Sequence, residues 1–272
     1  MDTYLIAQLQ NYFFLPFPCY NPPMTTLETR YHTVQQKIEA AAQKANRNPD
    51  EVTLVAVTKT WPVETILATY AAGMRHFGEN RAEELAQKRP AVEAALGPDS
   101  GIVWHFIGTL QSRKTNAIAD HADVFHALDR VKIANRLSKR LVANGRSHTN
   151  PLPTFLELNI SGEMSKSGVN CVDWENSATQ RAEIRNLGET VAALPGLTLQ
   201  GVMTMAPWQA EPDFIRTVFK RTRLLAEWLA AEMGLERPLA LSMGMTDDYQ
   251  LAIAEGATHV RVGRALFGSR TR

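Results

Sequence analysis

A lysine stands two residues beyond a short apolar run early in the chain. The run covers residues 52–57, and Lys59 follows it. Because side chains on a strand alternate between its two faces, Lys59 continues the face of Val55 and Val57 past the end of the run. Loss of hydration among apolar neighbours favours the neutral, nucleophilic amine that a Schiff base requires. The alternative is a strand-end lysine whose ammonium group extends into solvent.

Two glycine-containing segments near the C-terminal end could hold an anion. They are Ser242-Met243-Gly244-Met245-Thr246 and Val262–Gly268. Glycines allow backbone N–H groups to approach a phosphate closely, and Ser242 adds a hydroxyl donor. We expect the anion around Ser242–Gly244 and Gly263–Arg264. Thr246-Asp247-Asp248 has the pattern of a helix N-terminus, and its two carboxylates would repel a phosphate. Ordinary turns would give the same glycine pattern.

Arg261 lies between Val260 and Val262. If both valines face outer helices, alternation turns Arg261 toward the interior, where a buried guanidinium needs an anion or a hydrogen-bond acceptor. A pyridine nitrogen is such an acceptor, and an arginine that stays protonated would leave that nitrogen unprotonated. A structural salt bridge is the alternative for this residue.

Three further polar residues, Asn80, His105 and Gln111, could line the same site. His105 is equally consistent with a hydrogen-bonded histidine of the core. The histidines show no paired metal-binding spacing, so we predict no metal site. The sequence contains no nucleophile-elbow, P-loop or dinucleotide-binding motif.

The elements that must position these residues alternate between strand and helix. Strands are expected at 52–57, 75–78, 103–107, 124–127, 154–160, 197–203, 239–241 and 259–262. Helices are expected at 28–45, 63–72, 81–89, 112–119, 131–143, 176–193, 213–233 and 247–255. This alternation predicts a parallel sheet, and eight such units in about 250 residues match a TIM barrel. A doubly wound open sheet is the alternative.

The two ends of the chain refine this expectation. Only residues 263–272 follow the last expected strand, too few for a full covering helix, and the helix at 28–45 could fill that place. We therefore predict an α/β fold, a single TIM-like (β/α)8 barrel with an extra N-terminal helix, over residues 24–272. Residues 1–23 contain four prolines after an acidic start, and we expect a poorly ordered extension there. The alternative is a cleaved or partner-binding segment.

Composition narrows the setting. The formal net charge of +1 gives no electrostatic case for nucleic acid or an acidic membrane as partner. No apolar run reaches the roughly 18 residues of a membrane span. Cys19 and Cys171 are too few for a disulfide framework, so a reducing cytoplasm is the simplest location.

Several segments together resemble the pyridoxal phosphate homeostasis protein family. They are Val55–Lys59, Phe77–Asn80, Trp104–Gln111, Asn159–Glu163, Lys166–Gly168, Gly201–Pro207, Leu241–Met245 with Asp247-Asp248, and Val260–Gly263. The resemblance implies a fold like the N-terminal domain of alanine racemase, with pyridoxal 5′-phosphate (PLP) bound as a Schiff base to Lys59. With the argument from the residues, it gives these further cofactor-binding residues: Asn80, Met205, Ser242, Met243, Gly244, Arg261, Gly263 and Arg264.

Two positions depart from the family pattern. Thr246 stands where serine is commoner, which keeps a hydroxyl. Arg264 stands where a small hydroxyl residue often assists the phosphate, so that only its N–H or its guanidinium can contribute.

The resemblance implies a role in handling free PLP without an established reaction. We expect a monomeric PLP carrier of intracellular PLP homeostasis, with PLP-dependent apoenzymes as recipients and without strong catalytic activity. Alanine racemase-type enzymes add a β-rich domain and take a catalytic tyrosine from a partner subunit, and no stretch of that size follows the last expected strand. The first alternative is a small PLP-dependent racemase or lyase acting on amino acids. A weaker one is a Schiff-base aldolase acting on a phosphorylated sugar.

Overall fold

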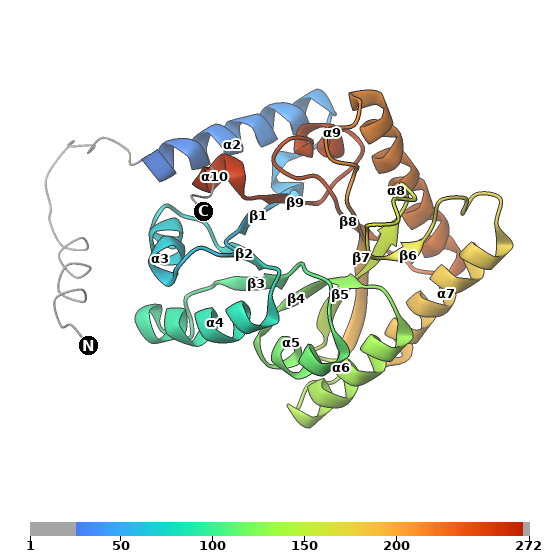
Figure 1. Ribbon diagram of the computed structural model, residues 1–272, viewed down its shortest axis with the longest axis horizontal. Coiled ribbons are helices and arrows are strands. Elements are labelled where there is room, and N and C mark those ends of the chain that lie inside the picture. Colours follow the sequence, from blue (N-terminus) through green and yellow to red (C-terminus); the bar gives the residue numbers. More distant parts are fainter. Residues whose placement is uncertain (1–25, 269–272) are drawn as a thin grey trace, which may run out of the picture.

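Short apolar runs form the strands of a closed parallel barrel (Figure 1). The computed structural model describes residues 26–268. In ring order the strands are β1 (Thr53–Val57), β2 (His76–Glu79), β3 (Val103–Phe106), β4 (Val124–Leu128), β5 (Leu152–Asn159), β7 (Leu197–Thr204), β8 (Ala240–Ser242) and β9 (His259–Val262). The pairing of β4 with β5 and of β1 with β9 closes the ring, which excludes the open-sheet alternative. The predicted N-terminal extension at 1–23 lies outside the described residues.

The helices surround the barrel on its outer side (Figure 1). They are α2 (Thr26–Lys44), α3 (Val63–Ala71), α4 (Ala82–Leu96), α5 (Thr115–His121), α6 (Val131–Ala143), α7 (Ala178–Ala193), α8 (Pro212–Glu232), α9 (Tyr249–Ala254) and α10 (Arg264–Phe267), with 3-10 turns η1 (Pro49–Glu51) and η2 (Ser112–Lys114). The extra helix α2 packs against α9 and α10, at the place predicted for it. Within the described range, no helix has the length and apolar character needed to cross a membrane.

Amphipathic patterning explains how these helices attach. In α6, the buried residues Ile133, Leu137 and Leu141 recur every fourth position and form one face against the barrel. Ser177 begins α7 by accepting a hydrogen bond from the Gln180 N–H at 3.3 Å. Pro212 occupies the first turn of α8, where its missing N–H costs nothing.

Four features differ from the sequence-based expectations. Helix α4 continues through Pro90 to Leu96, because Val92 beyond the proline is buried in the core and its packing offsets the lost hydrogen bond. The last full helix begins at Tyr249 instead of residue 247. The short strand β6 (Val169–Asn170), which pairs with the end of β5, and the single-turn helix α10 were not predicted.

Candidate functional site

A cavity of about 590 Å³ opens where the strands end at their carboxyl side. Loops after β1, β2, β3, β7, β8 and β9 line it, together with residues inside β1, β5 and β9. The lining residues are Val57, Lys59, Asn80, Arg81, Ile107, Gly108, Thr109, Glu157, Met205, Trp208, Met245, Thr246, Asp247, Arg261, Gly263 and Arg264. Six of the predicted cofactor-binding residues therefore meet in one place: Lys59, Asn80, Met205, Arg261, Gly263 and Arg264.

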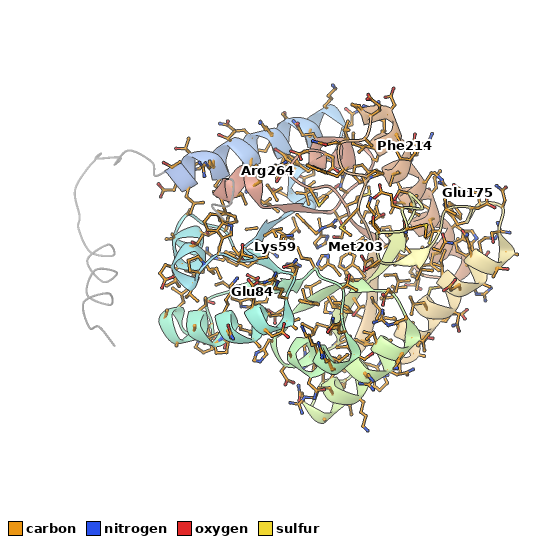
Figure 2. All side chains as sticks on the ribbon, viewed as in Figure 1. Lys59, Glu84, Glu175, Met203, Phe214 and Arg264 are labelled. Carbon is orange, nitrogen blue, oxygen red and sulfur yellow. The ribbon has the colours of Figure 1, made fainter. Side chains whose placement is uncertain are left out.

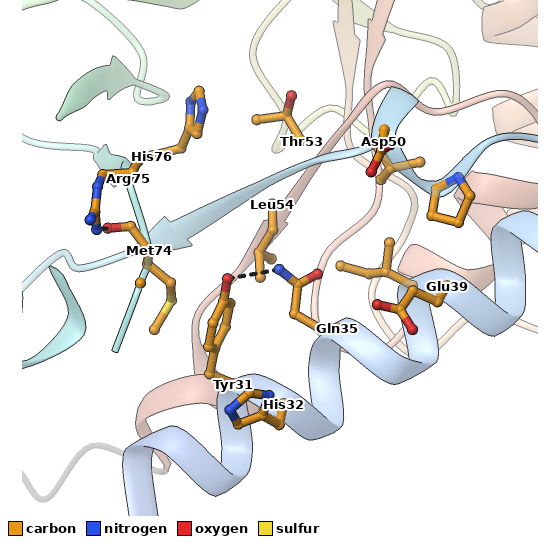
Figure 3. Close-up of a pocket in the computed structure, with 14 residues that line it drawn as sticks. Tyr31, His32, Gln35, Glu39, Asp50, Thr53, Leu54, Met74, Arg75 and His76 are labelled. Carbon is orange, nitrogen blue, oxygen red and sulfur yellow. Dashed lines mark hydrogen bonds between the residues drawn. The ribbon is translucent and has the colours of Figure 1, made fainter. Parts of the chain in front are cut away.

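A second pocket, of about 630 Å³, lies at the amino end of β1 and β2 beside α2 (Figure 3). Tyr31, Gln35 and His76 are among its lining residues, and Gln35 donates a hydrogen bond to the Tyr31 hydroxyl at 2.8 Å. It has no lysine on its wall and lies at the end of the barrel where conserved residues usually serve stability. The cavity at the carboxyl ends is therefore the candidate site.

Lys59 lies just past β1 and lines this cavity, toward the centre of the barrel (Figure 2). A Cβ added to Gly78 of β2 would lie 2.9 Å from Val55 Cγ1 and 3.7 Å from Val57 Cγ2, so both valines project toward that neighbouring strand. Lys59 therefore follows a wall of valines, as the alternation predicted. The backbone reverses after it, since Thr60 has a φ of 68°.

Arg261 projects from β9 into the cavity and is 4 % exposed. One of its amino groups donates to the carbonyl and to the hydroxyl oxygen of Ser242, both at 2.7 Å. The other donates to the Thr204 carbonyl at 2.9 Å. Burial lowers the pKa of Arg261 to about 10, so it remains charged at neutral pH. No carboxylate bonds to it directly, which argues against the salt-bridge alternative.

A chain of histidines continues from Arg261 through the barrel interior. Ser242 Oγ lies 2.8 Å from His126 Nδ1, and His126 Nε2 lies 2.8 Å from His105 Nδ1. His105 Nε2 then lies 2.9 Å from His76 Nδ1. Burial, and secondarily the positive charge of neighbours, lowers the pKa of His105 and His126 well below the usual value, which keeps them neutral. His105 is thus the hydrogen-bonded core histidine that the sequence left open.

Ser242, Met243 and Gly244 do not line the cavity. Ser242 is fully buried, and its hydroxyl forms hydrogen bonds with Arg261 and His126. Gly244 has a φ of 93°, and a Cβ there would lie 2.7 Å from the Cβ of Ala252 in α9. Its glycine therefore serves a tight turn against that helix. A direct contact of these three residues with a cofactor stays a prediction.

The loop after β9 supplies the rim of the cavity. Gly263 lines it, and Arg264 begins α10, whose first N–H groups have no acceptor inside the helix. The Arg264 guanidinium donates to the Asp247 carboxylate. Asp248 precedes α9 and accepts from the Met245 N–H at 2.5 Å, so it closes a turn instead of capping the helix.

Glu157 is a buried side chain of the cavity that the sequence reasoning missed. It lies inside β5, is 2 % exposed and has a buried Oε2 atom without a hydrogen-bond partner. Burial first, and the nearby Asp129 second, raise the pKa of Glu157 to about 7. The available signal was a charged residue within an otherwise apolar strand. Asn80 Oδ1 is a second buried oxygen of the cavity without a partner.

These groups fit a ligand that is a phosphorylated aromatic aldehyde. Lys59 offers an amine, Arg261 offers a charged donor to a ring acceptor, and the two unpartnered oxygens could accept from polar ring substituents. Arg264 and the backbone near Gly263 offer donors to a phosphate. Among residues 26–268, no three His, Cys, Asp or Glu side chains gather as a metal site would require.

Comparisons with known proteins find relatives over most of the chain. The family model described as alanine racemase, N-terminal domain, matches residues 30–271. A protein of Pseudomonas aeruginosa named pyridoxal phosphate homeostasis protein is 42 % identical over 247 residues, which are 91 % of this chain and 97 % of the relative.

Two solved structures share the fold at useful identity. PipY of Synechococcus elongatus PCC7942, in a structure described as having PLP bound, has a TM-score of 0.72 and 30 % identity, covering 89 % of this chain and 100 % of that one. A structure described as an unknown protein from Bifidobacterium adolescentis has a TM-score of 0.78 and 33 % identity, covering 91 % of this chain and 98 % of that one.

Proposed function

Because the chain belongs to the pyridoxal phosphate homeostasis protein family, which is built on the alanine racemase N-terminal domain, we propose that it binds PLP as a Schiff base on Lys59 and takes part in intracellular PLP homeostasis. The observation that carries this proposal is the meeting of Lys59 and Arg261 in one cavity. They stand on adjacent strands, where Val55 of β1 pairs with Arg261 of β9. A relative with 30 % identity is described with PLP bound.

Several residues of the cavity have a chemical task in this proposal. PLP supplies an aldehyde and an electron-accepting ring when bound. Lys59 provides the amine nucleophile, and Val57 beside it limits the hydration of that amine. Arg261 donates to the ring nitrogen and, being protonated, leaves that nitrogen without a proton. Asn80 orients the ring through its unpartnered oxygen, and the residues around Gly263 and Arg264 hold the phosphate.

The proposal that the protein carries PLP also concerns its partners and its location. We propose that PLP-dependent apoenzymes receive the cofactor from this protein, which acts as a monomer in the cytoplasm. Trp208 supports access from outside, because it lines the cavity and is 71 % exposed. No tyrosine is among the described residues that line the cavity, so the phenolic acid–base group of racemases has no counterpart there.

The covalent attachment is tested by spectroscopy and peptide mapping. Purified protein incubated with PLP should absorb in the visible, and borohydride should fix the cofactor on the peptide containing Lys59. Lys59→Ala should lose that adduct. Lys166→Ala is the matched control, since the Lys166 ammonium lies beside the cavity and bonds the Met205 carbonyl at 3.0 Å. A wild-type label on Lys166 or any lysine other than Lys59 would refute the assignment.

The phosphate is tested by comparing PLP with pyridoxal. Each hydrogen bond to a charged group contributes on the order of 1.5–3 kcal/mol, so pyridoxal should bind much more weakly. Gly263→Leu should abolish retention of the cofactor, whereas Gly263→Ala should be mild, because an added Cβ would meet Val57 at 3.4 Å. Equal affinity for pyridoxal and PLP would mean that the phosphate site lies elsewhere.

Glu157 favours a second candidate function, a slow racemase or lyase acting on amino acids. A carboxyl group whose pKa is about 7 is suited to proton transfer at neutral pH. Holoprotein incubated with L- and D-amino acids should show negligible turnover if the protein is a carrier, while a PLP-dependent apoenzyme mixed with it should gain activity. Robust turnover that Glu157→Gln removes would instead support the enzyme.

A further inference from the structure

Both peptide groups of Lys59 are held by side chains from other elements. On one side, the Thr58 carbonyl accepts a hydrogen bond from Lys88 Nζ at 2.9 Å. On the other side, the Thr60 N–H donates to Glu84 Oε2 at 2.6 Å. Lys88 and Glu84 both belong to α4, and Figure 2 shows Glu84 close to Lys59.

A buried ionic network connects these two anchors. Lys88 Nζ donates to Glu84 Oε2 and to Glu79 Oε1, both at 2.8 Å. Glu79 Oε1 also accepts from the Thr58 hydroxyl at 2.7 Å. The three N–H donors of the Lys88 ammonium are therefore all used, two on carboxylates and one on the backbone beside Lys59.

Burial makes this network stiff. Glu79 is fully buried, the Lys88 side chain is 9 % exposed and that of Glu84 is 18 % exposed. Charge-assisted hydrogen bonds away from water are short and directional, so they restrict the atoms that they join. Surface ion pairs of the same spacing lack this effect because solvent screens them.

The backbone of Thr60, next to Lys59, has a strained conformation that the network helps to maintain. Its φ of 68° lies in the left-handed region, which a β-branched residue rarely adopts. Such a conformation persists where surrounding contacts determine it, and it is common next to functional groups. The hydrogen bond from the Thr60 N–H to Glu84 joins the network directly to this strained residue.

We propose that Lys88, Glu79 and Glu84 form a positioning network that fixes the direction of Lys59 by anchoring the peptide groups on both sides of it. None of the three lines the cavity, so they act through the backbone of Lys59 and do not touch the cofactor. The inference rests on the proposed attachment of PLP to Lys59. The network adds that residues of β2 and α4 set the direction from which the Lys59 amine meets the aldehyde.

The rate of PLP capture by apoprotein, followed by stopped-flow absorbance across pH, tests this inference. Glu84→Ala should lower the plateau of the capture rate by about 10–100-fold, since displacing a reacting group by about an ångström costs this much. Glu84→Gln should retain most of the wild-type plateau, because its amide oxygen can still accept from the Thr60 N–H. Both variants remove the same charge. An effect of that charge on Lys59 would therefore shift the midpoint of the curve of capture rate against pH equally in both.

Glu93→Ala is the matched control on the same helix. It removes a carboxylate that pairs with Arg89 at 2.8 Å and has no connection to the loop of Lys59. Its capture rate should equal that of wild type. Glu84→Ala with a wild-type plateau would overturn the inference, while a wild-type protein without an adduct at Lys59 would overturn the proposed function instead.

Hydrogen exchange of the wild-type apoprotein gives a second readout that needs no variant. The Thr60 amide belongs to a loop, yet the network predicts exchange as slow as that of the β1 amides. Exchange at the rate of an exposed loop amide would overturn the inference even if Glu84→Ala did not fold.

Discussion

The network around Lys88 is charged, whereas the histidine chain that ends at Arg261 is neutral. In the first, a cation and two carboxylates are buried together beside Lys59. In the second, Arg261 bonds only to neutral oxygens, and the histidines behind Ser242 have pKa values lowered by burial. The first reaches the cavity through the backbone beside Lys59, and the second through Arg261. They differ in what they do with charge.

This difference separates two ways of supporting a site. The charged network pairs Lys88 with two carboxylates and leaves only Glu79 Oε2 without a partner, and its hydrogen bonds hold the backbone on both sides of Lys59. The neutral chain leaves the positive charge of Arg261 without a bonded counter-ion and thus directed at the cavity. A carboxylate bonded to Arg261 would compete with any ring acceptor, and a chain of neutral histidines avoids that competition.

The largest expected effect comes from breaking the charged network. Lys88→Met would leave the buried Glu79 carboxylate without a cation and remove the buried partner of Glu84, which would keep only the exposed Arg81. Breaking a buried ion pair in this way costs about 3–5 kcal/mol of unfolding free energy. Urea denaturation at pH 7 measures this loss. Lys114→Met, which breaks an exposed pair with Glu83, is the control and should lose far less stability because solvent screens that pair. Equal losses in the two variants would show that burial adds nothing.

The neutral histidines should make the free energy of unfolding fall on acidification. Burial lowers the pKa of His259, whose ring packs against those of His105 and His126, from 6.5 to about 4. Between these values the unfolded chain binds more protons than the folded one. The contribution is therefore complete above pH 6.5 and falls by about 3 kcal/mol as the pH drops to 4.

The measurement is unfolding free energy against pH in wild type and His259→Phe. The variant keeps a ring in place and should show a flatter loss between pH 6.5 and 4. Identical slopes would indicate that His259 is charged in the folded protein.

Glu157 should give the opposite pH dependence. Its pKa rises from 4.5 to about 7 on folding, so between these values the folded protein binds more protons. Its contribution is complete below pH 4.5 and is lost as the pH rises to 7. Glu157→Gln should therefore stabilise the apoprotein at pH 8 by about 3 kcal/mol and leave it nearly unchanged at pH 4.5. Thermal unfolding at the two pH values tests this, and a destabilised variant at pH 8 would contradict it.

The smallest effect is expected at the rim, outside both networks. Asp247 is exposed and bonds Arg264. Asp247→Asn should release the guanidinium and remove a negative charge near the proposed phosphate, strengthening PLP binding by less than about 1 kcal/mol. The gain should disappear at high salt because the pair is exposed to solvent. Titration at low and high ionic strength checks this, and an unchanged affinity at low salt would place the phosphate away from Asp247.

The sequence alone was informative where signals are local. Alternation of strand residues placed Lys59 at the end of β1 and turned Arg261 inward, because period-two geometry needs no knowledge of partners. The eight strands and the extra helix α2 were likewise predicted from runs of apolar residues and from the short stretch after β9. The helix boundary at Pro90 was wrong because a local breaker was outweighed by packing of Val92.

The site beyond these residues depended on contacts between strands far apart in the sequence. Ser242 was predicted as a phosphate donor, yet its hydroxyl meets His126 and Arg261, 116 and 19 positions away. The pKa of Glu157 is raised by its burial in the barrel, opposite β1. The spacing of residues in the sequence does not show this burial.

Sequence by itself determined the order of the elements and the family, and it singled out Lys59 as the amine that we propose for the Schiff base. Tertiary structure decided which polar groups are charged and which are neutral. The physical reason is that a side chain's protonation and hydrogen bonding depend on its desolvation and on its neighbours, and barrel closure alone brings β1, β2, β5, β8 and β9 around one cavity.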